Sequence, residues 1–193
     1  TATRAAETVS IAAAKLPFVN PDNLGPELVT NGDFSDGAAG WSDSANATLS
    51  VSGGYGLVTT SAASNGSSQT ISGLTIGAMY RLQGNLKNGA NAANTDLRIV
   101  TTGGALVSNL RVSSSVDTFV SGYFFATDTQ HLIRLLVNAS TYPANSFFDN
   151  ISVREVTALE LSIAMRGRMT GGTLTPTRWY LSADNAILQQ INT

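Results

Sequence analysis

The sequence predicts an all-β protein built as a β-sandwich, and three observations carry this prediction. Short apolar stretches alternate with polar residues at a period of two, which places successive side chains on opposite faces of a strand. The chain of 193 residues is rich in Ser, Thr, Asn, Gly and Ala, whereas Lys and Glu, which favour helices, are scarce. Turn residues separate the stretches at short, fairly even intervals, as in a sandwich or jelly roll of roughly eight to ten strands.

Two stretches are expected to begin and end the sandwich. The first, residues 27–35, is a short strand followed by an Asn31-Gly32 turn, and it closes at Gly40-Trp41. The second, residues 147–156, is the expected closing strand. Between them the clearest strand is 79–87, in which Tyr80, Leu82, Gly84 and Leu86 share one face. The other expected strands are 48–51, 55–60, 68–71, 96–99, 119–126 and 131–137, with a short strand and turn at 72–77, and Ile151 and Val153 mark the closing strand.

The flanks of this stretch are interpreted separately. Residues 1–26 are expected to form a linker or docking arm, because three prolines, at 17, 21 and 26, interrupt any helix. Within it, residues 4–16 form either an extended segment or a short helix. Residues 157–193 restart the alternation but are too few to close an independent β core. They are the start of a further β segment, either part of a second domain or strands completed by another subunit. Because the sequence begins at Thr1, the chain is expected to be processed or excised.

Composition excludes several classes of function. A net charge of −2 with only 12% charged residues argues against a nucleic-acid partner. No apolar run approaches the roughly 20 residues that span a membrane, so no membrane insertion is expected. The chain has no cysteine and a single histidine, His131, which offers neither a catalytic triad nor a Cys/His metal cluster. The few acidic residues lie mostly on turns, so the sequence predicts no enzyme.

Residues 27–156 resemble a carbohydrate-binding module of the family-four/nine type, which implies a galactose-binding-like jelly roll. The resemblance is spread over most of this stretch. The matching motifs are Leu28-Val29-Thr30-Asn31-Gly32-Asp33-Phe34, Gly40-Trp41, Gln69-Thr70-Ile71 before Gly73-Leu74, Gly77-x-x-Tyr80-x-Leu82, Phe124-x-Ala126, and Phe148-Asp149-Asn150-Ile151-Ser152-Val153-Arg154.

The flanking segments are similar to parts of bacteriophage and prophage tail-fibre or host-specificity proteins. The similar residues are Thr3 to Glu7, then Arg166-Gly167-Arg168-Met169 and Arg178-Trp179-Tyr180, in a segment that resembles the start of a concanavalin/laminin-G-like domain. This resemblance implies a virion appendage whose partners are other appendage subunits, arranged as a homotrimer, and a bacterial surface polysaccharide.

The resemblance also implies a structural calcium ion at the junction of the two chain ends, bound by carboxylates and backbone carbonyls. The matching positions are Asp33 and Asp149, with backbone carbonyls near Asn31 and Asp33 as further ligands. Many relatives carry a Glu two residues after the motif glycine, and here Phe34-Ser35-Asp36 departs from that pattern. In the alternative interpretation, Asp33 caps its own turn and Asp149 accepts bonds from nearby backbone N–H groups.

Sugar sites combine aromatic rings with polar donors and acceptors. The residues expected to play these parts are Arg81, Gln83, Asn85, Arg98 and Arg134 on strand faces, with rings from Tyr55, Tyr123 and the loop residue Tyr142. The alternative is that these strand faces are simply solvated. Four other aromatic residues, Trp41, Tyr80, Phe124 and Phe148, match core positions and are expected to pack inside.

The sequence therefore predicts a non-enzymatic virion appendage module that contributes to attachment to a bacterial surface glycan. Weak binding by each module would be multiplied by avidity in a trimer. Two alternatives remain open. One is a structural spacer or assembly domain that binds no sugar. The other is the carbohydrate-targeting module of a secreted glycoside hydrolase, which would act outside the cell.

Overall fold

The computed structural model describes the backbone of residues 8–10, 19–63, 65–158, 162–164, 177–181 and 188–192, and the side chains of residues 24–63 and 65–157. Every regular element in these residues is a β-strand, so none of them forms a helix that could cross a membrane. The chain divides into two units, one of residues 11–160 and one that combines residues 1–10 with 161–193.

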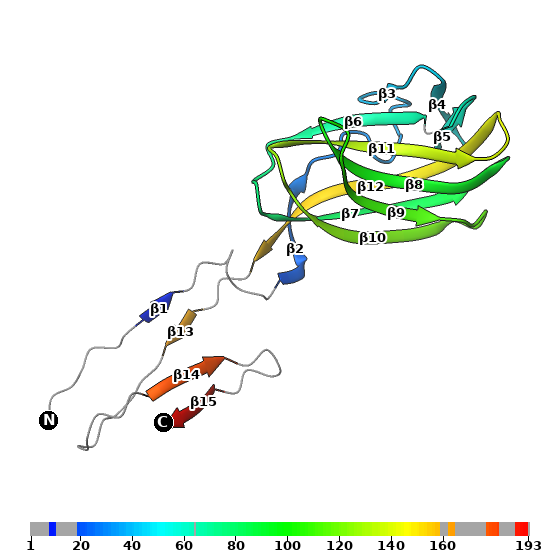
Figure 1. Cartoon of the computed structure of the whole chain (residues 1–193). Helices are drawn as coiled ribbons and strands as arrows, with labels where there is room; N and C mark the ends of the chain where they lie inside the picture. The colour runs from blue at the N-terminus through cyan, green and yellow to red at the C-terminus, as the bar shows by residue number, and fades with distance from the viewer. Residues whose placement is uncertain are drawn as a thin grey trace, which may run out of the picture. The chain divides into compact units, whose positions relative to one another are not determined.

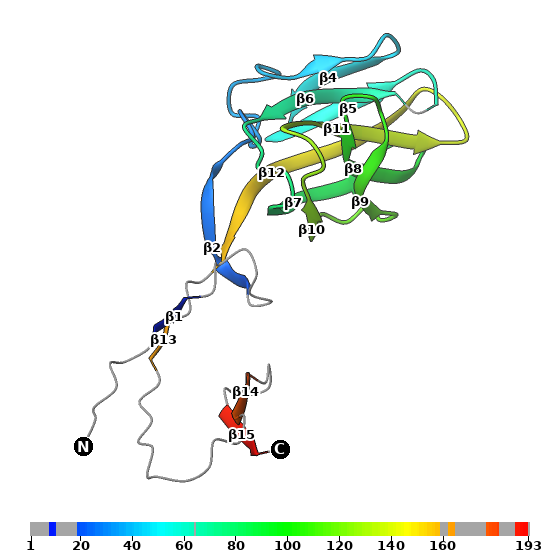
Figure 2. The same ribbon diagram turned by 60° about the vertical axis from the view of Figure 1, so that its left-hand side comes forward.

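The larger unit is a sandwich of two antiparallel sheets, stacked as two layers (Figure 1 and Figure 2). We call them sheet 1 and sheet 2. Sheet 1 contains, in order, β10 (Thr118–Phe125), β7 (Met79–Asn88), β12 (Ala144–Ala158), β5 (Tyr55–Thr60) and β4 (Ala47–Ser52), and β2 (Val19–Glu27) also pairs with β12. Sheet 2 contains, in order, β3 (Ser42–Asp43), β6 (Gly66–Ser72), β11 (Gln130–Ala139), β8 (Ala92–Thr101) and β9 (Leu106–Val112). The predicted all-β jelly-roll sandwich is confirmed.

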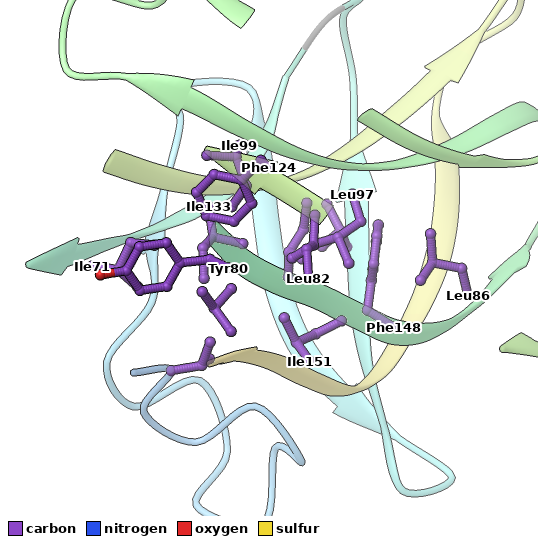
Figure 3. Packing of buried hydrophobic residues seen from close by; sticks show 14 of the residues in the cluster. Ile71, Tyr80, Leu82, Leu86, Leu97, Ile99, Phe124, Ile133, Phe148 and Ile151 are labelled. Atoms are coloured by element: carbon purple, nitrogen blue, oxygen red, sulfur yellow. The ribbon is translucent and has the colours of Figure 1, made fainter. Parts of the chain in front are cut away.

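The core fills the space between the sheets. On β7 the predicted face is buried, with Tyr80, Leu82 and Leu86 at most 1% exposed. They pack with Phe148 of sheet 1 and with residues of sheet 2 that include Leu97, Ile99 and Ile133 (Figure 3). Burying one such side chain stabilises the fold by about 1.5–3 kcal/mol. Three of the four expected core aromatics, Tyr80, Phe124 and Phe148, are buried, and Trp41 is partly buried against Phe34.

The two predicted end stretches lie side by side. The backbone N–H of Leu28 donates to the carbonyl of Val153 (3.0 Å), and that of Ile151 donates to the carbonyl of Gly32 (2.9 Å). A Cβ at position 32 would lie 2.0 Å from the Ile151 carbonyl oxygen, so this approach requires glycine. Asn31 has a φ of +52°, as its predicted turn demands.

Two features of the larger unit were not expected. Residues 19–26, assigned by sequence to the N-terminal arm, form β2 together with Glu27, and in this strand Leu24 pairs with Val156 and Glu27 with Arg154. Strand β9 was not among the predicted strands, and its burial in the structure does not alternate cleanly. The boundary between arm and sandwich stays a prediction.

The smaller unit consists of two strand pairs. Strand β1 (Thr8–Ser10) pairs with β13 (Ser162–Ala164), and β14 (Thr177–Leu181) pairs with β15 (Leu188–Asn192), both antiparallel. Of residues 4–16, predicted to be extended or helical, those of β1 are extended. Residues 3–7 and the Arg166 to Met169 motif lie outside the described residues.

Candidate functional site

The sandwich distributes the predicted sugar contacts over two opposite outer faces. Arg98 on β8 and Arg134 on β11 lie on the outer face of sheet 2. The other strand residues lie on the outer face of sheet 1, namely Arg81, Gln83 and Asn85 of β7, Tyr123 of β10 and Tyr55 of β5. Tyr142 belongs to neither face. The predicted residues therefore do not form one site, and each face has to be assessed alone.

A row of polar side chains crosses sheet 2 from edge to edge. Strand register places Arg134 directly opposite Arg98, and it places Ser68 of β6 on the other side of Arg134. The row continues to Ser42 of β3 at one edge and to Asn109 of β9 at the other. With neighbouring strands about 4.8 Å apart, the row is about 19 Å long. It is long enough to follow an extended oligomeric ligand.

The adjacent row contains a buried carboxylate, Asp96, which is fully covered. It accepts hydrogen bonds from Arg111 Nε (2.7 Å) and Nη2 (2.8 Å), from Asn138 Nδ2 (2.8 Å) and from Arg98 Nη2. Burial by itself would raise the pKa of Asp96, but the bonds from Arg111 and Arg98 outweigh it and lower the pKa. Asp96 therefore stays ionised and holds both guanidinium groups in fixed positions.

A hollow of about 540 Å³ adjoins one end of the polar row. Its lining combines the hydroxyl side chains of Thr30, Ser42, Ser68 and Thr70 with the apolar side chain of Leu132. Gln69 fixes the wall of the hollow to the sheet. Its Oε1 accepts from the Thr30 N–H (2.8 Å), and its Nε2 donates to the carbonyls of Thr30 (2.8 Å) and Gly40 (3.1 Å). The hollow is thus preformed rather than shaped by a mobile loop.

The outer face of sheet 1 is aromatic. Phe119, Tyr123 and Phe125 of β10 are 60%, 49% and 58% exposed, and they share one face. On β5, the Tyr55 hydroxyl lies 3.1 Å from Oδ2 of Asp117, and this hydrogen bond raises the pKa of Tyr55. Lys87 Nζ lies 3.8 Å from the centre of the Tyr55 ring. Tyr55 is therefore already engaged within the protein, whereas the β10 rings face outward.

Tyr142 lies in the connection between β11 and β12, before the cis peptide bond to Pro143. It is partly buried against the core, and its hydroxyl donates to the Ala139 carbonyl (2.9 Å). Its ring packing and its hydroxyl bond therefore both stabilise the connection between β11 and β12. The structure does not bring Tyr142 together with the other predicted contacts.

The residues predicted to bind calcium are bonded locally. Asp33 accepts from the N–H and the hydroxyl of Ser35, which lowers its pKa, and Asp149 accepts from the N–H and the side-chain amide of Asn150. Asn31 Nδ2 donates to the carbonyls of Gly37 and Ala39, both at 3.0 Å. Burial, together with the charges of Asp117 and Asp33, raises the pKa of Asp149. Across the described residues no three His, Cys, Asp or Glu side chains form a metal-binding group. A calcium site takes 6–8 oxygen ligands, backbone carbonyls among them, and a calcium ion at these residues stays a prediction.

His131 faces the core rather than a cleft. Its ring is fully buried, its Nε2 accepts from the Thr127 N–H (3.2 Å), and it meets the Phe124 ring edge-on. Burial lowers the pKa of His131, so the ring is neutral at physiological pH. In this position it packs and accepts a hydrogen bond.

No family model matches the chain, and no curated protein matches it in sequence. Solved structures do resemble it in fold. The CBM22-1 xylan-binding domain from Paenibacillus barcinonensis Xyn10C is 18% identical, with a TM-score of 0.53, and the match covers 70% of this chain and 97% of that one. The CBM22-1–GH10 modules of Clostridium thermocellum endo-1,4-beta-D-xylanase 10B, complexed with xylohexaose, are 15% identical, with a TM-score of 0.52, over 68% of this chain and 29% of that one.

A third structure comes from a virus. The enzymatically active domain of bacteriophage CBA120 tailspike protein 4 is 13% identical, with a TM-score of 0.52, over 67% of this chain and 21% of that one. At such identities these similarities define a class of fold, the jelly-roll β-sandwich found in carbohydrate-binding modules. The function has to be argued from the site.

Proposed function

We propose that the chain is a non-catalytic carbohydrate-binding module whose saccharide lies across the outer face of sheet 2. The observation that carries this proposal is the junction of the hollow with the polar row. Ser42 and Ser68 belong to both, so a ligand seated in the hollow continues along the row towards Arg134 and Arg98. The fold shared with a xylan-binding domain supports a saccharide as the ligand.

The lining of the hollow suits a sugar. The hydroxyls of Ser42, Ser68 and Thr70 each donate and accept, and so match a ring that carries hydroxyl groups. Leu132 provides an apolar surface for the C–H groups of the ring. Because Gln69 holds the wall in place, little conformational entropy is lost on binding.

The affinity of one module is expected to be low. None of the outward positions that the structure describes on β6, β8 and β11 carries an aromatic ring. Without stacking, binding depends on hydrogen bonds that replace bonds to water and so contribute only about 0.5–1.5 kcal/mol each. Useful attachment then requires several copies that bind the same polymer.

Weak binding by one module fits a setting in which several copies act together. We place the module on a virion appendage that holds a bacterial surface polysaccharide, with other appendage subunits, as a homotrimer, supplying the avidity. The resemblance of the flanks and the shared fold of a phage tailspike domain support this setting. The shared fold of a xylanase module supports the alternative equally, a targeting module of a secreted glycoside hydrolase.

A second candidate function is assembly without sugar binding. It is favoured by the exposed rings of Phe119, Tyr123 and Phe125 on edge strand β10. Exposed apolar groups that cluster in this way are typical of protein contact surfaces.

Native gels cast with soluble polysaccharides test the proposal. A bound polymer retards the full-length chain. Replacing Ser68 by Leu should abolish the retardation, whereas Ser121→Leu, the matched change on the outer face of sheet 1, should preserve it. If Ser121→Leu abolishes the retardation and Ser68→Leu preserves it, the sugar binds to the outer face of sheet 1 instead. Failure to bind any polymer, even when the chain is presented on beads, would favour the assembly function.

A further inference from the structure

The centre of the outer face of sheet 2 carries an excess of positive charge. Arg98, Arg111 and Arg134 lie on neighbouring strands, and the one carboxylate at the described outward positions of β6, β8, β9 and β11 is Asp96. The whole chain, by contrast, has a net charge of −2. Two arginines directly opposite each other on adjacent strands destabilise a sheet unless an anion lies between them.

Asp96 cannot supply that anion for Arg134. Both of its oxygens are occupied, by Arg111, Arg98 and Asn138. Arg134 makes no hydrogen bond or ion pair with any residue that the structure describes. The face therefore has a fixed guanidinium on Arg98 and an unpaired one on Arg134.

Arg98 has spare capacity for an anion as well. It binds Asp96 through Nη2, and its Nε is buried without a partner among the described residues. Its side chain is 26% exposed, so part of the side chain is open to solvent. Because Asp96 holds it in place, Arg98 is preorganised for a second acceptor.

We infer that the saccharide bound here is acidic and that Arg134, with Arg98, binds its carboxylate. This inference rests on the proposed function of the same face. A guanidinium offers parallel N–H donors that match the two oxygens of a carboxylate. The sugar ring then extends over Ser68 into the hollow, where Leu132 meets its C–H groups. The ligand class is a uronate-containing polysaccharide.

Other anions share part of this chemistry, since arginine also binds sulfate and phosphate groups. Three polymers distinguish binding of a carboxylate from binding of a neutral sugar and from binding of another anion. Alginate carries a carboxylate on each sugar, dextran is neutral, and dextran sulfate is anionic without carboxylates. Binding of the full-length chain to each is measured by titration calorimetry at low and at physiological salt.

The variants test whether the paired N–H donors of the Arg134 guanidinium are needed for binding. Arg134→Ala should weaken alginate binding about tenfold or more. Arg134→Lys should recover only a small part, because lysine keeps the charge but loses the paired donors. Arg154→Ala removes one charge from the outer face of sheet 1 and should change the affinity less than twofold. Thermal unfolding confirms that each variant is folded.

The results distinguish the inference that the saccharide is acidic from the proposed function, which is that the outer face of sheet 2 binds a saccharide. Alginate bound at least about tenfold more tightly than dextran, with dependence on Arg134, supports the inference. If dextran binds as well as alginate and Arg134→Ala has no effect, the inference is wrong while the proposed function stands. Equal losses in Arg134→Ala and Arg154→Ala, or tighter binding of dextran sulfate, overturn it in favour of general electrostatics. If no polymer binds, the proposed function itself fails.

Discussion

The two outer faces of the sandwich are built from similar alternating strands and present opposite chemistry. On sheet 1, Phe119 and Phe125 are more than half exposed, whereas the polar groups around Tyr55 are bonded to one another. On sheet 2, the outward apolar residues Leu136 and Val100 are covered, at 1% and 5% exposure. There the polar groups beside them include the guanidinium of Arg134, which has no hydrogen-bond or ion-pair partner among the residues that the structure describes.

This difference shows that a polar strand face is not by itself a binding face. What matters is whether the polar groups already have hydrogen-bond partners within the protein. Asn85 and Tyr55 both bond to Asp117 on sheet 1, and Arg134 on sheet 2 does not find such a partner in the described part of the chain. The unsatisfied groups are the ones that gain most from a ligand.

The largest effect is expected from Asp96→Asn, which removes the charge that organises sheet 2. Two guanidinium groups would then lie together without a carboxylate, and one of their nitrogens is buried. Breaking a fully buried pair costs about 3–5 kcal/mol. Because Arg111 is 48% exposed, we expect a smaller loss, about 2–3 kcal/mol in the free energy of unfolding. Urea denaturation at pH 7 measures it.

The matched control is Asp117→Asn, on an exposed carboxylate beside sheet 1, which should cost less than about 1 kcal/mol. The loss in Asp96→Asn should also depend on pH. Because folding lowers the pKa of Asp96, its contribution is present above the unfolded value of about 3.8 and is lost as the pH falls through the folded value. A difference between wild type and variant that stays constant down to pH 2 would contradict this account.

The next effect concerns the wall of the hollow. Gln69→Ala removes three hydrogen bonds to Thr30 and Gly40 and leaves partly buried backbone groups unpaired. We expect a loss of about 1–3 kcal/mol in the free energy of unfolding, together with weaker polysaccharide binding in the native gel. Gln83→Ala, the corresponding change on the outer face of sheet 1, should do neither. Equal effects of the two substitutions would show that the outer faces of sheet 1 and sheet 2 do not differ in binding the polysaccharide.

A smaller effect of opposite sign is expected at Asp149, on the outer face of sheet 1. Here burial and the neighbouring Asp117 and Asp33 raise the pKa, so the ionised form is unfavourable in the folded state. Stability is therefore lost as the pH rises from about 3.8 through the folded pKa. Asp149→Asn should stabilise the fold at pH 7 by up to about 0.5 kcal/mol. Destabilisation at pH 7 that persists at pH 3 would show that the bonds to Asn150 dominate instead.

The sequence was sufficient for the fold and for the faces of single strands. Alternation on β7 identified Tyr80, Leu82 and Leu86 as buried. Such alternation is a local property, and local properties can be read along the chain. The stretches at 27–35 and 147–156, which were expected to begin and end the sandwich, lie side by side.

The candidate site could not be derived in the same way, because it depends on strand register. Arg98 and Arg134 were both singled out, but nothing in the sequence indicates that β8 and β11 pair with these residues opposite. Asp96 was missed because it looks like any polar residue on an alternating strand. Its burial depends on Arg111 and Asn138, which come from two other strands. Tyr142 was placed in a loop, but its hydroxyl bond to Ala139 could not be foreseen.

The smallest effect on stability is expected from the rings on sheet 1. Replacing Phe119 and Phe125 together by Ser should change the free energy of unfolding by less than about 0.5 kcal/mol per residue, because both rings are mostly exposed. If this face contacts another subunit, the same variant should lower the sedimentation coefficient of a self-associating sample, while Leu106→Ser, an equally exposed change on β9, should not. Polysaccharide binding by each monomer should persist in both variants. A double Phe variant that sediments as wild type but no longer binds the polymer would place the sugar on the aromatic face, and the arginines of sheet 2 would then need another explanation.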